Sequence, residues 1–214
     1  MYRGSGKLKR KPMLLKKYLE YTRLREKRTI GIIGVNRGAG ATYTGMLLAF
    51  YYGTEKRVKT AFLECNNHGD FKRIQDAFEW SREDERTFSL DRITFFKEVA
   101  SNEIPEIFSD DYGCYIMDFG TDCESWKAEF KRCGIKIIVG DRALWNQSKT
   151  VELVKSLENV KGSDNWTYII PYANKKMLKQ ASKKTGKKFI AIPYETDCTL
   201  LSKETIKLFD RLFG

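Results

Sequence analysis

The sequence is poor in metal-binding side chains and in paired cysteines. Its 214 residues include one histidine, His68, and no C-x-x-C pair. The odd cysteine count and the missing pairs argue against a zinc site and a disulfide framework, and they predict reduced, mostly buried thiols in a cytoplasmic protein. The five cysteines are Cys65, Cys114, Cys123, Cys133 and Cys198.

Long apolar runs are also missing. No stretch is apolar over the roughly 20 residues that a membrane-spanning helix needs, and the basic first residues lack the apolar segment of a signal peptide. The apolar fraction of 42% is nevertheless enough for a sizeable core. The length fits a single α/β domain.

Excess positive charge is confined to the N-terminal end of the chain. The net charge is +11, and residues 1–28 hold eleven Lys and Arg against Glu20 and Glu26, a net charge of +9. The rest of the chain therefore carries only +2. We divide the sequence into a basic N-terminal arm, residues 1–28, and a globular domain, residues 29–214.

Within the arm, apolar spacing predicts an amphipathic helix over residues 13–27. The residues on its apolar side are Leu14, Leu15, Tyr18, Leu19 and Thr22. Such a helix either packs its apolar stripe on the domain, or meets an anionic membrane surface, nucleic acid or an acidic partner protein. The pattern alone does not separate these alternatives.

A glycine-rich turn follows the first apolar run of the domain. Residues 30–33 are typical of a buried strand, Gly34, Gly38 and Gly40 punctuate the turn, and an apolar run suited to a helix begins at Met46. This order forms a phosphate cradle when backbone N–H groups point inward at a helix N-terminus. The alternative is a plain strand-to-helix connection. The usual motif, G-x-x-x-x-G-K-[ST], has a lysine where this chain has alanine.

The segment Asn36-Arg-Gly-Ala-Gly-Ala-Thr-Tyr43 resembles the deviant phosphate loop K-G-G-V-G-K-T-T of the MinD/ParA family of ATPases. Asn36 and Ala41 stand at the positions of the family's two lysines, which normally touch phosphate, the first across a dimer interface. The resemblance implies a degenerate nucleotide site in which Arg37 is the available cation. The site residues in this loop are Asn36, Arg37, Gly38, Ala39, Gly40, Ala41, Thr42 and Tyr43.

Two later segments extend the resemblance. The residues after the strand expected at 58–63 resemble the family's D-x-D-P-Q-G, with Glu64 in place of the first acid and Asn66 in place of the second. An amide cannot act as a base and binds metal less well than a carboxylate. Asp118 resembles the Walker B aspartate that ends a buried strand. The resemblance implies that Thr42 and Asp118 hold magnesium if ATP binds, and no other metal site is expected. Both segments also suit ordinary polar turns.

Alternating strand and helix patterns predict an α/β fold with a doubly wound, mostly parallel sheet. The resemblance, which covers residues 28–214, implies the three-layer sandwich of P-loop NTPases. Further strands are expected at 92–96, 110–120, 135–140, 166–170 and 188–194. Helices are expected at about 41–52, 71–80, 101–109, 141–158, 175–186 and 202–213, with Gly53 and Gly186 as stops and Ser202 as an N-cap.

These features imply a pseudo-ATPase, inactive or weakly nucleotide-binding, that acts as a scaffold or localisation factor. The TadZ/CpaE branch of the family also tolerates atypical phosphate loops, and its members position Flp-type pilus or secretion machinery. The expected partner is then a protein of a membrane-associated assembly, with homodimerisation, in the cytoplasm or at the inner face of the membrane. The alternative is an active ATP-dependent switch of the ParA type that uses Arg37, Thr42 and Asp118 and binds DNA through the arm. A bacterial tyrosine kinase domain is disfavoured, because the C-terminus has no tyrosine cluster.

Overall fold

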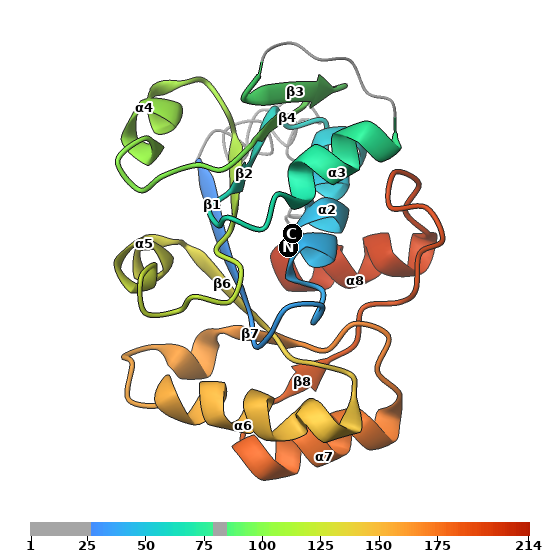
Figure 1. Ribbon diagram of the computed structural model, residues 1–214. Helices are drawn as coiled ribbons and strands as arrows, with labels where there is room; N and C mark the ends of the chain where they lie inside the picture. The colour runs from blue at the N-terminus through green and yellow to red at the C-terminus, as the bar shows by residue number, and fades with distance from the viewer. Residues whose placement is uncertain (1–26, 79–84) are drawn as a thin grey trace, which may run out of the picture.

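A computed structural model describes residues 27–78 and 85–214 of the chain (Figure 1). The helix expected at 13–27 lies outside the described residues except for Lys27, and the last two residues of the helix expected at 71–80 also lie outside them.

One eight-stranded sheet organises the described chain. Its spatial order is β3-β4-β2-β5-β1-β6-β7-β8, and every neighbouring pair is parallel except β3 with β4. The sheet confirms the predicted α/β fold with a mostly parallel sheet. The strands are β1 (Arg28–Gly34), β2 (Thr60–Glu64), β3 (Thr87–Leu90), β4 (Ile93–Phe96), β5 (Cys114–Asp118), β6 (Ile135–Val139), β7 (Thr167–Ile169) and β8 (Phe189–Ile190).

Helices cover both faces of the sheet, which gives three layers (Figure 1). One face carries α2 (Ala41–Phe50), α3 (Asp70–Ala77) and α8 (Lys203–Phe213). The other carries α4 (Ile104–Ser109), α5 (Lys127–Arg132), α6 (Gln147–Ser156) and α7 (Lys175–Thr185). Short helical turns are η1 (Tyr51–Glu55), η2 (Leu144–Asn146) and η3 (Ser163–Asn165).

The central strand β1 is buried on both sides because alternate residues face the two cores. Ile30 and Ile32 pack with α2 and α8, while Ile33 packs with the opposite cluster. Gly31 also faces that opposite side, where a Cβ would lie 2.8 Å from both Cys133 Sγ and a ring carbon of Phe130. The missing side chain lets α5 approach the sheet closely.

Several local predictions hold and several fail. Ser202 caps α8 by accepting a hydrogen bond from Thr205 N–H at 3.3 Å, and Gly186 ends α7 with a φ of 71°. The stop expected at Gly53 is wrong, because α2 continues into the π-helical turn η1, which contains that glycine. The helix expected at 141–158 begins only at Gln147, after η2, and the strand expected at 188–194 has two residues. Neither the edge strand β3 nor α5 was predicted.

Candidate functional site

The carboxyl ends of β1, β2 and β5 meet at one edge of the sheet, where open α/β sheets usually bind ligands. A pocket of about 340 Å³ opens there, within the size range of small-molecule sites. It is lined by the loop after β1, the start of α2, the turn before α3 and the residues after β5. The lining residues are Asn36, Arg37, Gly38, Gly40, Ala41, Thr42, Tyr43, His68, Asp70, Arg73, Gly120 and Thr121.

The loop from Asn36 to Gly40 has the backbone of an anion cradle. Gly38 and Gly40 have φ angles of 84° and 102°, which other residues rarely adopt. A Cβ on Gly40 would also lie 3.0 Å from Pro171. The N–H groups of Gly40, Ala41 and Thr42 meet no acceptor within the described part of the chain. Free N–H groups at the N-terminus of a ten-residue helix favour a negatively charged ligand.

Thr42 lines the pocket and is bonded to Asp118, which does not itself line it. The Thr42 hydroxyl donates to Asp118 Oδ2 at 2.6 Å, and Gly120 N–H donates to Oδ1 at 2.9 Å. Asp118 is fully buried, and this burial raises its pKa, while the two hydrogen bonds oppose the rise. The residue pair that the resemblance assigns to magnesium is therefore brought together.

Asn36 is held away from the pocket centre by a contact that the sequence did not suggest. Its amide nitrogen donates at 2.8 Å both to the carbonyl of Arg37 and to Asp141 Oδ2. Asp141, just after β6, also accepts from Asn146 Nδ2 and from the Ala143 N–H, each at 2.7 Å. Asn36 Oδ1 is buried and has no partner among the described residues. The first lysine position thus serves to tie two loops together.

Glu64 and Asn66 are both engaged in local structure. Glu64 is buried at the end of β2, where its Oε1 accepts from the N–H groups of Asp70 and Phe71 at 2.6 and 3.2 Å, and so holds the start of α3. Burial raises its pKa despite these bonds. Asn66 donates to the carbonyl of Asp118 at 2.9 Å and accepts from the His68 N–H at 3.0 Å. Neither side chain lines the pocket.

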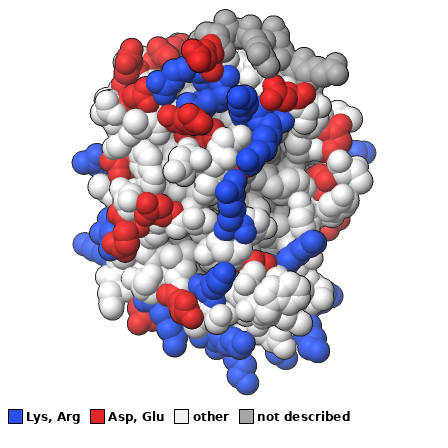
Figure 2. Space-filling model, viewed as in Figure 1, with Lys and Arg blue, Asp and Glu red and all other residues white. Residues whose placement is uncertain are grey.

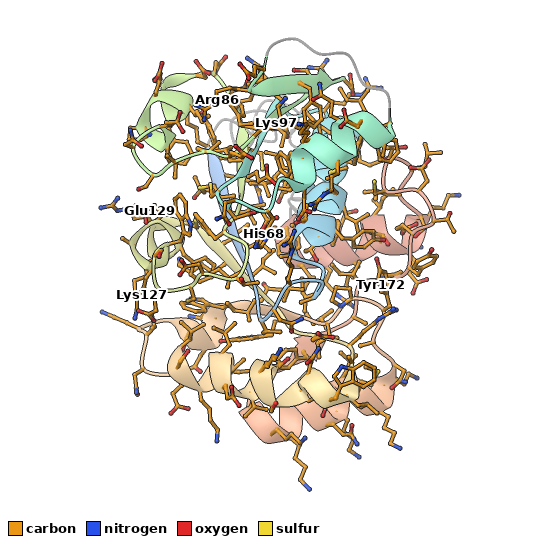
Figure 3. All side chains as sticks on the ribbon, viewed as in Figure 1. His68, Arg86, Lys97, Lys127, Glu129 and Tyr172 are labelled. Carbon is orange, nitrogen blue, oxygen red and sulfur yellow. The ribbon has the colours of Figure 1, made fainter. Side chains whose placement is uncertain are left out.

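Arg37 supplies positive charge at the pocket. Its guanidinium lies 3.4 Å from the carbonyl oxygen of His68, which also lines the pocket and is labelled in Figure 3. Arg73 also lines the pocket, but it pairs with Asp70 at 2.8 Å. Figure 2 shows Lys and Arg side chains in a stripe along the middle of this face, continuing from the site past α3. The pocket therefore lies in a positive part of the surface.

Tyr43 lines the pocket, and its hydroxyl is bonded to the chain between β8 and α8. Its hydroxyl accepts from the Glu195 N–H at 3.1 Å, and its ring lies 5.3 Å from that of Tyr172, edge to face. Asn174 caps α7 by accepting from the Met177 N–H at 3.0 Å. Its side chain is thus committed to the helix.

Seven of the eleven site residues expected from the sequence line the pocket. Asp118 is bonded to Thr42 of the loop, Ala39 is buried, and Glu64 and Asn66 lie outside the lining. His68, Asp70 and Arg73 were missed, although their positions in the turn after β2 and in the first turn of α3 were a usable signal. Asp141 was missed as well, and only its place after an apolar strand could have indicated it.

The residues present fit a magnesium nucleotide in part. Glycine-loop N–H groups would hold phosphate oxygens, and Thr42 with Asp118 would hold magnesium, which supplies charge neutralisation to phosphates when bound. Elsewhere in the described residues, no group of three or more His, Cys, Asp and Glu side chains is placed to hold a metal ion. Within residues 27–78 and 85–214, no helix has the length and apolar character needed to cross a bilayer.

The fold and the pocket together define an α/β protein with a mostly parallel sheet and a glycine-rich loop at the carboxyl edge of that sheet. No family model matches the sequence, and no curated protein matches it. Solved structures do match. A ParA family ATPase from Chlorobium tepidum is 16% identical with a TM-score of 0.59, covering 87% of this chain and 93% of the other.

Two further structures have the same fold. A plasmid partition protein from Borrelia burgdorferi, described as putative and bound to AMPPNP, has a TM-score of 0.57 at 12% identity, covering 87% of this chain and 96% of its own. The septum site-determining protein MinD of Pyrococcus horikoshii, complexed with Mg-ADP, has a TM-score of 0.54 at 12% identity, with coverages of 79% and 82%. This chain therefore has the fold of ParA- and MinD-type P-loop ATPases.

Proposed function

We propose that this chain is a pseudo-ATPase, which binds nucleotide weakly or not at all and acts as a scaffold or localisation factor. One observation carries the proposal: neither lysine position of the phosphate loop holds a cation. Asn36 is bonded to Asp141, and Ala41 has no charge to offer. Each missing charge-assisted hydrogen bond removes about 1.5–3 kcal/mol of phosphate binding.

The same changes act more strongly on hydrolysis than on binding. Charge that develops on a transferred phosphoryl group is stabilised by nearby cations, and two of them are missing here. Asn66 adds to this effect, because its amide is bonded to the Asp118 carbonyl and the His68 N–H and cannot take up a proton. Arg37 remains as a partial substitute, so weak binding of ATP with magnesium is part of the proposal.

The proposed cellular role follows the TadZ/CpaE resemblance of the sequence. The partner would be a protein of a membrane-associated assembly, such as Flp-type pilus or secretion machinery, and the chain would act as a homodimer. Its place would be the cytoplasm or the inner face of the membrane. The +9 charge of residues 1–28 supports contact with an anionic surface.

Phosphate release from Mg-ATP by the purified protein tests the chemistry. We expect a rate equal to that of the buffer blank, with Thr42→Ala and Asp118→Ala at the same level. Turnover in the wild type that disappears in both variants would sink the pseudoenzyme proposal.

A second candidate is an active ATP-dependent switch that binds DNA. The Thr42–Asp118 pair, the Arg37 guanidinium and the basic stripe of Figure 2 favour it. Adding duplex DNA to the hydrolysis assay separates the two candidates, because only the switch gains turnover. A salt-sensitive rise in rate that needs residues 1–26 would establish the second candidate.

A further inference from the structure

An apolar groove lies beside the start of β1, on the α4–α5 side of the sheet. Its volume is about 260 Å³, and it is walled by the two helices with Thr29 of β1 at one edge. Its apolar lining consists of Ile104, Pro105, Phe108, Met117 and Cys133. Glu129 of α5, marked in Figure 3, accepts a hydrogen bond from the Ser101 hydroxyl at 2.6 Å and so links the two walls.

Acidic side chains surround this groove. Residues 98–132, which run to the end of α5, contain nine Asp and Glu against two Lys and Arg132, a net charge of −6, and Arg132 itself lines the groove. Glu106, Asp110 and Asp111 are exposed, and none of them forms an ion pair with another described residue. Figure 2 shows several Asp and Glu side chains on the α4 and α5 side of the molecule, with some Lys and Arg among them. An occupant of this groove should therefore be apolar on one side and positively charged on the other.

The described part of the chain begins beside this groove. The Lys27 ammonium donates to the carbonyl oxygens of Phe108 at 2.8 Å and Asp110 at 3.0 Å, at the C-terminal end of α4. Phe108 is one of the residues that line the groove. Residues 1–26 thus join the domain at the acidic rim, and they carry nine Lys and Arg against two Glu, a net charge of +7.

We propose that residues 13–26 of the same chain cover the α4–α5 groove. Leu15, Tyr18 and Leu19 lie against the apolar lining, and the Lys and Arg side chains of the segment face Glu106 and Asp110. Tethering through Lys27 makes this association intramolecular, which raises its effective concentration far above that of a free partner. The segment is basic and the rim of the groove is acidic, and this attraction orients the segment with its basic side toward the rim.

Hydrogen exchange of the full-length protein tests this assignment. In the wild type, the amides of α4 and α5 should exchange slowly. The double change Leu15→Ser with Leu19→Ser removes the apolar contact and should speed their exchange by about tenfold or more. Leu24→Ser is the matched control, because it removes an apolar side chain on the side of the expected helix away from the stripe. The exchange of α7 should stay constant in all variants.

The acidic rim gives an independent measurement. Glu106→Lys should speed exchange in α4 and α5, and Glu152→Lys on α6 makes the same charge change at a distant exposed position. Equal exchange in wild type and the Leu15/Leu19 variant would overturn the proposal. Protection that grows with protein concentration would also overturn it, because the occupant would then be the segment of a second copy.

Discussion

Ala41 is the position at which the proposed nucleotide pocket can be tested most sharply. It begins α2, is half-buried and lines the pocket beside Thr42. Ala41→Lys places an ammonium among the loop N–H groups and adds a charge-assisted hydrogen bond to phosphate, of about 1.5–3 kcal/mol. A cation at a helix N-terminus costs about 0.3–1 kcal/mol in the free protein. That cost lowers the stability of the unliganded protein and is relieved when phosphate binds, so it does not subtract from the binding gain. Affinity for Mg-ATP should therefore rise about ten- to a hundred-fold.

Titration calorimetry with Mg-ATP at concentrations up to the millimolar range measures this gain. Two control variants separate charge in the pocket from other effects. Ala41→Gln gives a long uncharged side chain at the same place, and Ala128→Lys adds the same charge at an exposed position of α5, on the other face of the sheet. Both should bind within about twofold of the wild type, well below the tenfold that 1.4 kcal/mol represents.

Two results would refute this reasoning. If Ala41→Lys is folded and still binds no nucleotide at millimolar concentration, the loop does not cradle phosphate and the fold serves as a scaffold alone. If the wild type already binds at micromolar concentration, Arg37 supplies the missing charge. In that case Arg37→Ala should bind Mg-ATP more weakly than the wild type, by the same factor that was expected as the gain from Ala41→Lys.

Three further predictions concern the arm and the buried carboxylates. Deleting residues 1–26 should abolish binding to anionic vesicles or DNA while the circular dichroism spectrum stays native, whereas an unfolded product would place the segment in the core. Because burial raises the pKa of Asp118 above its usual 3.8, the folded state holds that proton more tightly, and the free energy of unfolding falls as the pH rises from about 4. Asp118→Asn should flatten this fall in urea unfolding across the pH series, and an unchanged slope would contradict the assignment. Asp141→Ala should lower the free energy of unfolding by about 2–3 kcal/mol, since Asn36 and Asn146 lose a charged acceptor; a loss below about 0.5 kcal/mol, the usual range for a neutral surface change, would show that the contact is incidental.

The sequence was sufficient where local chemistry decides the structure. The apolar run before the glycine-rich turn became β1, and Ser202 and Gly186 ended their helices as their side chains predicted. The prediction that the helix ends at Gly53 is wrong because contacts with α8, which is distant in the sequence, extend the helical turn past that glycine. Tyr51 is buried with its hydroxyl on Asp210 of α8 at 2.7 Å, and Lys56 binds the same carboxylate at 2.6 Å. These contacts draw the chain into an extra π-helical turn, and no local pattern records them.

The pocket shows the same division between local and distant contacts. The cradle backbone follows from the order of strand, glycine-rich turn and helix, which is readable along the chain. The hydrogen bond of Asn36 could not be predicted from the sequence. Its partner Asp141 lies 105 residues further on and meets it only when β6 pairs with β1. Arg37 likewise reaches His68 only after β2 has been placed in the sheet.

Asn36 and Asn66 also make hydrogen bonds that hold the loops of the pocket when no ligand is bound. A lysine only donates hydrogen bonds and an ionised carboxylate only accepts them, but an amide does both. Asn66 uses both functions, since it donates to the Asp118 carbonyl and accepts from the His68 N–H. A carboxylate there would repel that carbonyl, and a lysine at position 36 could keep the bond to Asp141 only by turning its charge away from phosphate. Both asparagines therefore stabilise the loops through contacts within the chain, as expected of a fold that keeps its shape whether or not nucleotide is bound.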